Sequence, residues 1–149
     1  MKSSVFATFI ILALAGYFGY GYATEHFNQP ALIYKDFADA VIANDLDQAR
    51  NFASAGAAQS AFQNSARRHL LLGQGDIKLT YYTINSFYYS DSGDAATIDA
   101  VQTVRVDPPG ANSVFGQSSV SFPEHAELEF RDGLWKVKSF SDSLSTTTR

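Results

Sequence analysis

Few side chains in this sequence have the types and spacing that a chemical site requires. The densest basic group is Arg67-Arg68-His69, which ends a run of helical periodicity. Two guanidinium groups beside an imidazole could bind an anion. Positive charge in the last turn of a helix also complements the helix dipole without any ligand. This second interpretation is the simpler one, and it predicts that the three side chains lie on a solvated helix end.

Sulfur, metal and phosphate chemistry are not indicated. The chain has no cysteine, which excludes disulfides, thiolate nucleophiles and Cys-ligated zinc or iron–sulfur clusters. His26 and His125 stand alone, without the His or carboxylate spacing of a metal site. Gly73-Gln74-Gly75 follows a helical run, so it reads as a helix stop and not as a phosphate loop. We therefore expect no metal and no cofactor.

Composition argues against one class of partner. The 149 residues include 11 basic and 15 acidic side chains, so the formal charge is −4. A nucleic-acid-binding domain would be strongly basic, and we expect no nucleic-acid partner. With 12 Phe, 8 Tyr and 1 Trp, the chain has enough large apolar side chains to fill a hydrophobic core.

The N-terminal segment predicts where the protein resides. Residues 5–22 form an uncharged, mostly apolar run after Lys2. A membrane-spanning helix needs about 20 such residues. Aromatic residues crowd the end of the run, where an interfacial belt would lie: Tyr17, Phe18, Tyr20 and Tyr22. We expect residues 1–23 to be a single-pass anchor in the bacterial cytoplasmic membrane, with the C-terminal domain on the periplasmic side.

Two questions about this segment stay open. It could instead be a cleaved signal peptide, since Gly21-Tyr22-Ala23 is an acceptable small-x-small cleavage site. Gly16 and Gly19 could let a second helix approach the span closely. The alternative is that these glycines only loosen the end of the helix.

Beyond a linker at 24–29, the periodicity indicates helices first and strands second. Apolar residues have helical spacing over 30–44, 46–52 and 57–72, and alternate over 76–90, 95–106, 118–131 and 134–140. Asp132-Gly133 predicts a tight hairpin turn between the last two strands. Segregated elements of this kind indicate an α+β fold. We expect one cone-like domain at 30–141, with about three helices on a curved four-stranded antiparallel sheet, and a flexible tail at 142–149.

Three stretches carry a family resemblance. PALIYKDFADAVIANDLDQA, SDSGDAATIDAVQTVRV and ELEFRDGLWKVKSF resemble the nuclear transport factor 2-like (SnoaL-like) superfamily over residues 30–141. The resemblance implies a cone-shaped domain with a pocket between helices and sheet. Members include ketosteroid isomerase-like enzymes, polyketide cyclases, transport adaptors and membrane-anchored assembly subunits, so it implies fold more than function.

An isomerase-like site would need a pocket carboxylate as base and a Tyr beside a protonated acid. Asp99 with Tyr81 or Tyr88 could fill these roles. Alternation along its strand, however, puts Asp99 on the charged face, where we expect it to be solvated. We therefore expect no catalytic site. Trp135 and Val137 are expected to be core residues, packed against the helix that carries Phe37.

The first strand has a surplus of aromatic residues. Tyr82, Ile84 and Tyr88 alternate on the face opposite three other residues of the strand, Ile77, Leu79 and Tyr81. If the helices cover the face of Leu79 and Tyr81, then Tyr82, Ile84 and Tyr88 point outward. Exposed tyrosines are typical of a protein interface. The alternative is that a bulge or a loop covers them.

Together these features indicate where the protein is located and which surfaces it exposes, and they do not indicate a reaction. We expect a membrane-anchored, extracytoplasmic, non-catalytic accessory subunit that docks on a larger membrane-protein complex, with the lipid bilayer and other membrane-protein subunits as partners. The alternative is an exported small-ligand-binding protein or ketosteroid isomerase-like enzyme that uses the cone pocket.

Overall fold

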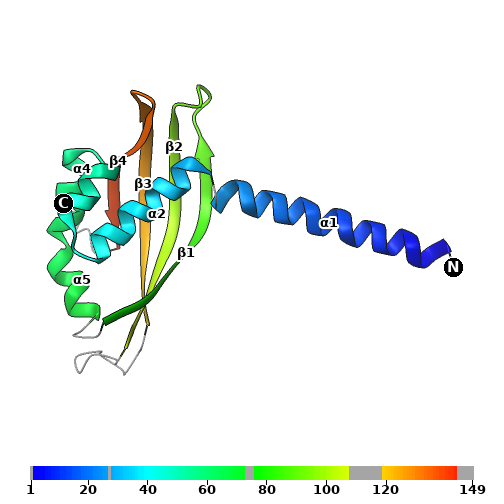
Figure 1. Cartoon of the computed structure of the whole chain (residues 1–149), viewed down its shortest axis with the longest axis horizontal. Helices are drawn as coiled ribbons and strands as arrows, with labels where there is room; N and C mark the ends of the chain where they lie inside the picture. Colours follow the sequence, from blue (N-terminus) through cyan, green and yellow to red (C-terminus); the bar gives the residue numbers. More distant parts are fainter. Residues whose placement is uncertain (1, 27, 73–75, 108–118, 144–149) are drawn as a thin grey trace.

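The computed structural model describes residues 2–26, 28–72, 76–107 and 119–143 (Figure 1). Within them, helices precede strands. The helices are α1 (Lys2–His26), α2 (Gln29–Ile42), α3 (Leu46–Phe52), α4 (Ala55–Gln63) and α5 (Ser65–Leu72). The strands are β1 (Asp76–Tyr89), β2 (Ala95–Asp107), β3 (Ser119–Arg131) and β4 (Leu134–Asp142). This order confirms the predicted α+β class and the four-stranded antiparallel sheet.

The strands form an antiparallel meander in the order β1-β2-β3-β4, so β1 and β4 are its edges. Strand β3 turns into β4 at Asp132-Gly133, where φ is 54° and 81°. A two-residue hairpin of this kind needs positive φ at both positions, which confirms the predicted turn. The segment between α3 and α4 pairs with the outer edge of β4, because Ser54 N donates to Val137 O at 2.8 Å.

Side-chain caps fix where the helices begin. Asn28 Oδ1 accepts a hydrogen bond from Ala31 N at 2.8 Å, and Pro30 lies in the first turn of α2, where its missing N–H costs nothing. Asp45 Oδ1 caps α3 by accepting from Gln48 N at 2.9 Å. From these starts, α2 runs across one face of the sheet, which we call the inner face (Figure 1).

The helical run predicted over 57–72 is two helices. Asn64 ends α4, and α5 begins at the next residue. This break redirects the chain, and Arg68 comes to lie inside the domain, 2% exposed. The expectation of a solvated Arg68 was therefore wrong, whereas Arg67 is exposed. The side chain of His69 lies outside the described residues.

The hydrophobic core lies between α2 and the inner face of the sheet. The Phe37 ring packs edge-on against the Phe140 ring, with 5.2 Å between centroids. The large, fully buried side chains of the core include Tyr34, Phe37, Ile98, Leu128 and Val137. The predicted burial of Val137 is thus confirmed. Trp135 is only half-buried, because it lies at the start of β4, near the end of the sheet.

Strand β1 departs from strict alternation. Its register against β2 shifts between Ile77 and Leu79 and again between Ile84 and Ser86. Each shift inserts one residue and moves the following side chains to the other face. Between the shifts, Tyr82 pairs with Gln102, so Tyr82 faces the helices.

The C-terminal boundary also differs from the prediction. Strand β4 runs through Asp142, which is buried, and so extends into the segment expected to be a tail. Residues 144–149 of that predicted tail lie outside the described part of the chain.

Helix α1 stands clear of the domain (Figure 1). Its described side chains are largely exposed, including Ile11, Leu12 and Phe18. In the part of the chain that the structure describes, no helix meets the combined length and hydropathy of a membrane span.

Phe37→Ala should lower the free energy of unfolding by about 3–5 kcal/mol, because a fully buried ring is replaced by a cavity. Trp135→Ala should cost less, since part of that side chain already contacts water. Thermal unfolding of the full chain in mild detergent, followed by circular dichroism, measures both. Leu32→Ala, at an exposed position of the same helix, is the matched control. Equal losses for Phe37→Ala and Leu32→Ala would contradict this core.

Candidate functional site

Two carboxyl groups face the helices from neighbouring strands. Glu124 of β3 and Asp142 of β4 are direct partners in the sheet register. Tyr34 of α2 donates a hydrogen bond from its hydroxyl to Glu124 Oε2 at 2.5 Å. Glu124 is 5% exposed and Tyr34 is fully buried, so this pair lies within the interior of the domain.

The environment of Glu124 favours its neutral form. Burial raises the pKa of the Glu124 carboxyl to about 8, against the opposing effects of the Tyr34 hydrogen bond and the Arg68 charge. Burial, and then the charge of Glu124, hold the pKa of the Tyr34 phenol well above its usual range. Around neutral pH, the carboxyl and the phenol are therefore both mainly protonated.

The charge of the Asp142 carboxylate is compensated by a neighbouring cation. Arg68 Nη2 forms an ion pair with Asp142 Oδ2, and Arg68 Nη1 donates to Ala61 O at 2.9 Å. Asn64 Nδ2 also donates to Asp142 Oδ1 at 3.4 Å. Among the described residues, Arg68 Nε has no hydrogen-bond partner. The ion pair joins α5 to the last strand, and it is the role that the structure gives to Arg68.

A second polar group lies between α2 and the edge of the sheet. The Tyr82 hydroxyl donates to Asp39 Oδ1 at 2.5 Å and accepts from Gln102 Nε2 at 3.0 Å. Its ring packs edge-on against Tyr34, with 5.7 Å between centroids. Burial raises the pKa of Asp39, although the Tyr82 hydrogen bond acts to lower it.

This geometry corrects part of the predicted interface. Tyr82 and Ile84 do not point outward: Ile84 is buried in the core and Tyr82 packs against it. The register shift between Ile77 and Leu79 is the reason. Ile77 shares the inner face with Tyr82, whereas Leu79 and Tyr81 point outward and are about half exposed. Tyr88 is 65% exposed on the outer face, as expected. A role of these residues in partner binding stays a prediction.

Asp99 has the placement that alternation predicted. It lies on the outer face, half-exposed, and accepts from Ser86 Oγ at 2.5 Å. His125 Nδ1 is 2.6 Å from the other carboxylate oxygen. Hydrogen bonds from His125 and then Ser86 lower the pKa of Asp99. Because Ser86 bonds to the carboxylate and not to the imidazole, this is not the arrangement that activates a serine nucleophile.

Two hollows are formed by described residues. One of about 520 Å³ runs along β2 and β3, where its lining includes Thr97, Glu127 and Glu129. A smaller one of about 240 Å³ lies between the start of α2 and the β3–β4 hairpin, and it is lined by Leu32, Leu134 and Trp135 among others. Glu124 and Tyr34 line neither hollow.

Sequence reasoning missed Glu124, although a signal was present. Phe122, Glu124, Ala126 and Leu128 occupy alternate positions of β3, so the carboxylate falls on an otherwise apolar face. A single acid in such a row predicts a buried carboxyl. The partners of Glu124 are far away in sequence, and no local pattern indicates Tyr34 or Arg68.

Comparison with known proteins agrees with this architecture. No protein-family model and no curated protein matches the sequence. A Shewanella frigidimarina protein assigned as a ketosteroid isomerase is similar in structure, with TM-score 0.51 and 16% identity, over 78% of this chain and 96% of that chain. The intermembrane space region of the chloroplast protein ARC6 is also similar, with TM-score 0.50 and 13% identity, over 74% of this chain and 90% of that chain.

A further solved structure, an NTF-2 like protein of unknown function from Shewanella oneidensis MR-1, gives TM-score 0.48 and 12% identity, over 75% of this chain and 93% of that chain. At these identities the likeness is one of fold. The domain shares its α+β fold with the Shewanella frigidimarina structure assigned as a ketosteroid isomerase, which agrees with the fold that the resemblance implied.

Stability should fall as pH rises from about 4.5 to about 8, and Glu124→Gln should remove much of this slope. The unfolded carboxyl ionises near its ordinary pKa of 4.5, whereas the folded one keeps its proton until about pH 8. Between these values the unfolded state binds fewer protons, so the folded state loses stability as pH rises. Thermal melts in mild detergent at several pH values measure the slope. Exposed Glu127→Gln is the matched control and should retain it; an unchanged slope in Glu124→Gln would refute the buried acid.

Proposed function

We propose that the chain is a membrane-anchored, non-catalytic accessory subunit whose domain docks on a larger membrane-protein complex. In this proposal α1 is the single-pass anchor, and the domain lies on the periplasmic side of the bacterial cytoplasmic membrane. Lys2 before the uncharged run and Glu25 after it support an N-terminus inside the cell.

The exposed apolar surface of α1 is the observation that carries the proposal. The helix has 25 residues, and residues 5–22 of the chain are uncharged. Ile11 is 66% exposed and Tyr17 is 76% exposed, so the domain leaves these side chains uncovered. A contiguous apolar surface of this kind requires a cover, and lipid is the cover that suits a helix apolar on all sides. Tyr17, Phe18, Tyr20 and Tyr22 would then form the interfacial belt.

Two surfaces are available for docking. The outer face of β1 presents Tyr81 and Tyr88 to solvent, which is the side-chain type enriched at protein interfaces. Within the span, a Cβ built at Gly16 or Gly19 would meet nothing within 4 Å, which leaves room for a second helix.

The interior supports a non-catalytic role. Tyr34 and Glu124 satisfy each other and are closed off from solvent, and the two hollows lie elsewhere. A substrate would have to open the core to reach the carboxyl.

One observation favours a second candidate, a small-ligand-binding protein or ketosteroid isomerase-like enzyme. Glu124 is a carboxyl with a raised pKa beside a tyrosine, and such a pair can hold or move a proton at a carbonyl compound. Turnover of a ketosteroid by the full chain, lost in Glu124→Gln, would favour this candidate over the subunit.

A photo-reactive amino acid at Tyr88 should cross-link to a membrane protein in native membranes, because this side chain lies on the proposed docking face. Gln63, an exposed residue of α4, is the control position and should give no adduct. Mass spectrometry identifies the adducts and the mature N-terminus in the same sample. An N-terminus at Thr24 would replace the anchor with a cleaved signal peptide, and a chain without adducts at Tyr88 would contradict docking through β1.

A further inference from the structure

Aromatic side chains line the end of the inner face beside the start of α2, and Leu32 of α2 and Leu134 of the β3–β4 hairpin border the same end around the smaller hollow. We call this set the mouth patch: Leu32, Phe87, Tyr89, Phe130, Leu134 and Trp135. Ring contacts join its aromatic members, with centroids 4.8 Å apart for Phe87–Tyr89, 6.1 Å for Tyr89–Trp135 and 5.5 Å for Phe130–Trp135. Leu134 is 61% exposed and Tyr89 is 50% exposed. The patch is therefore a continuous surface that spans both hairpins of the sheet.

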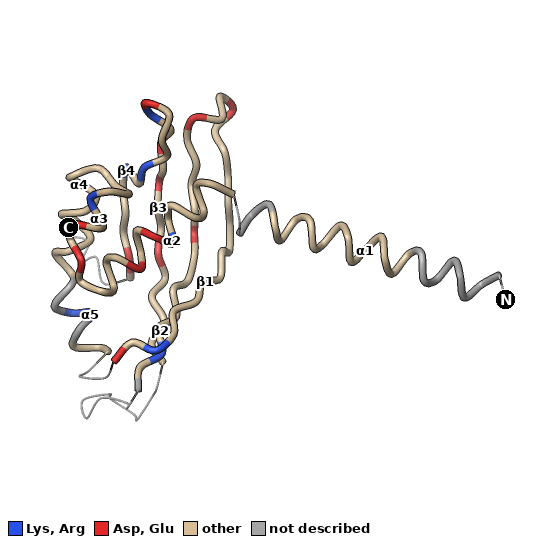
Figure 2. The backbone as a smooth tube through the Cα atoms, viewed as in Figure 1, with Lys and Arg blue, Asp and Glu red and all other residues tan. Residues whose placement is uncertain are grey.

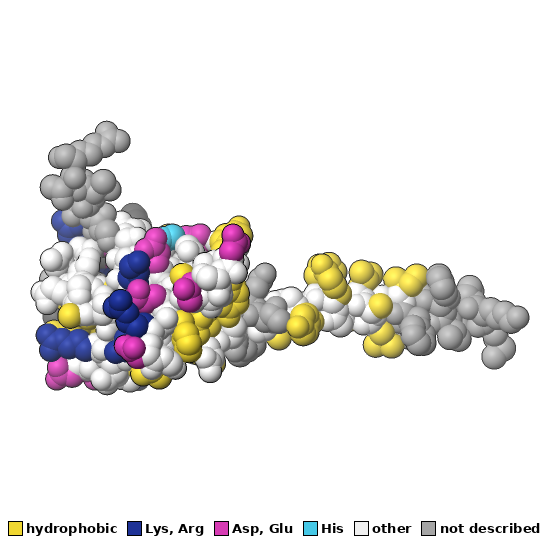
Figure 3. Space-filling model, turned by 90° about the horizontal axis from the view of Figure 1, so that it is seen from above, with side chains coloured by type: hydrophobic (Ala, Val, Ile, Leu, Met, Phe, Trp, Pro, Cys, Tyr) yellow, Lys and Arg dark blue, Asp and Glu magenta, His cyan; other side chains and the backbone are white. Residues whose placement is uncertain are grey.

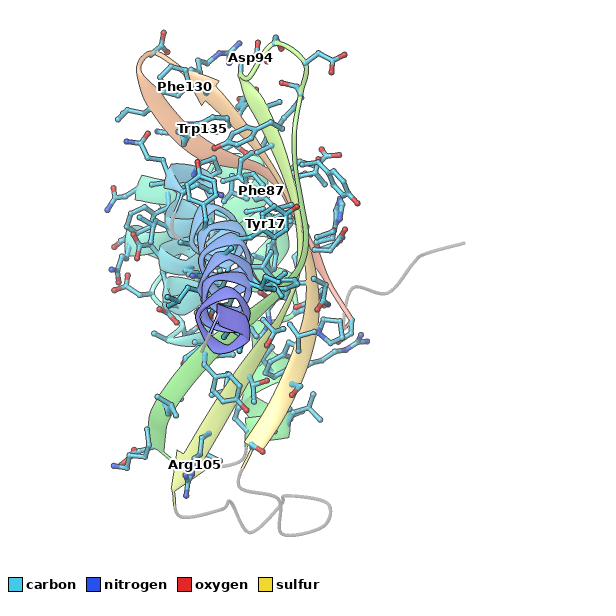
Figure 4. All side chains as sticks on the ribbon, turned by 90° about the vertical axis from the view of Figure 1, so that its right-hand side faces the viewer. Tyr17, Phe87, Asp94, Arg105, Phe130 and Trp135 are labelled. Atoms are coloured by element: carbon cyan, nitrogen blue, oxygen red, sulfur yellow. The ribbon has the colours of Figure 1, made fainter. Side chains whose placement is uncertain are left out.

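The mouth patch lies on the side of the domain from which α1 emerges. Figure 4 views that side: Phe87 appears next to the helix, and Trp135 and Phe130 lie above it, toward the tips of the hairpins. Seen from above, hydrophobic side chains gather on the domain next to the base of α1 (Figure 3). Helix α1 ends at His26 and α2 begins at Gln29, so Leu32 lies within two turns of the anchor.

The nearest strand carries no charge that would oppose contact with lipid. From Leu79 to Tyr89, β1 contains no Lys, Arg, Asp or Glu, and Figure 2 draws this length of the strand in tan. The charged residues of β1, Asp76 and Lys78, lie at its start, and Asp91 and Asp94 lie in the turn that follows the strand. Burying the mouth patch against lipid therefore leaves no ionised group of β1 without water.

We infer that the mouth patch rests on the lipid surface of the bilayer in which α1 is anchored. This inference rests on the proposed anchor. Tyr and Trp prefer the boundary between headgroups and acyl chains, where an apolar ring and a polar edge are both satisfied. Because α1 tethers the domain, the effective lipid concentration at the patch is high, and a weak contact is enough to orient the domain.

Trp135 is the chain's only tryptophan, so its fluorescence reports on the mouth patch alone. The experiment uses the full chain in phosphatidylcholine vesicles, with bromine placed near the headgroup or deep in the acyl chains. Bromine quenches tryptophan at short range. Trp135 emission should lose intensity with bromine near the headgroup and lose less with bromine deep in the chains.

A charge in the patch should weaken this contact. Leu134→Glu should reduce the quenching and shift Trp135 emission to longer wavelength. Leu70→Glu is the matched control, because Leu70 is exposed on α5 at the opposite side of the domain from α1, and it should change neither quantity.

Vesicle flotation in the same samples separates the possible failures. If the chain floats with the vesicles but bromine does not alter Trp135 emission, the lipid contact is refuted and the anchor stands. If quenching is absent and the emission instead shifts as the protein is diluted in lipid, a second copy of the chain covers the patch, which also refutes the inference. If the chain does not float, the anchor fails, and the lipid contact fails with it.

Discussion

An α-helix rises about 1.5 Å per residue and a β-strand about 3.3 Å, so the 14 residues of α2 extend over about 21 Å and the 14 residues of β1 over about 46 Å. One helix of this length cannot cover the inner face of the sheet. The middle of that face holds the core around Phe37. At one end, α5 adds a layer that includes Arg68. At the other end the hairpins extend past the helices, and the rings beside Trp135 are left half-covered (Figure 1).

The polar interior follows from the sheet register. Pairing of β3 with β4 sets Glu124 directly opposite Asp142, and two adjacent buried carboxylates cannot both keep a charge without compensation. The chain resolves this asymmetrically: Arg68 neutralises Asp142, while Glu124 keeps its proton and bonds to Tyr34. A buried, protonated Glu124 bonded to a tyrosine resembles a catalytic acid. The same hydrogen bond also has a structural role, because it lets the carboxyl be buried in the core.

Predictions that depend on neighbouring residues in the sequence agree with the structure, whereas predictions of which face of the sheet the helices cover do not. The Asp132-Gly133 turn depends only on neighbouring residues, and it is present as expected. The outward placement of Tyr82 failed because a bulge reverses every later side chain, and no residue of β1 marks the bulges clearly. The candidate site was hidden for a related reason. The position of Glu124 in an apolar alternation was visible, but its partners are contributed by α2 and α5, which sequence spacing cannot bring together.

Strand β1 is an edge strand, and its partner in the described sheet is β2 alone. The backbone N–H and C=O groups along its outer side consequently depend on water or on another molecule. In hydrocarbon such groups would cost several kcal/mol each, whereas the hydrated headgroup layer can satisfy them. For a domain tethered beside a bilayer, this edge would act as a depth stop. Its rings could enter the lipid surface, but its backbone would keep the sheet from sinking further.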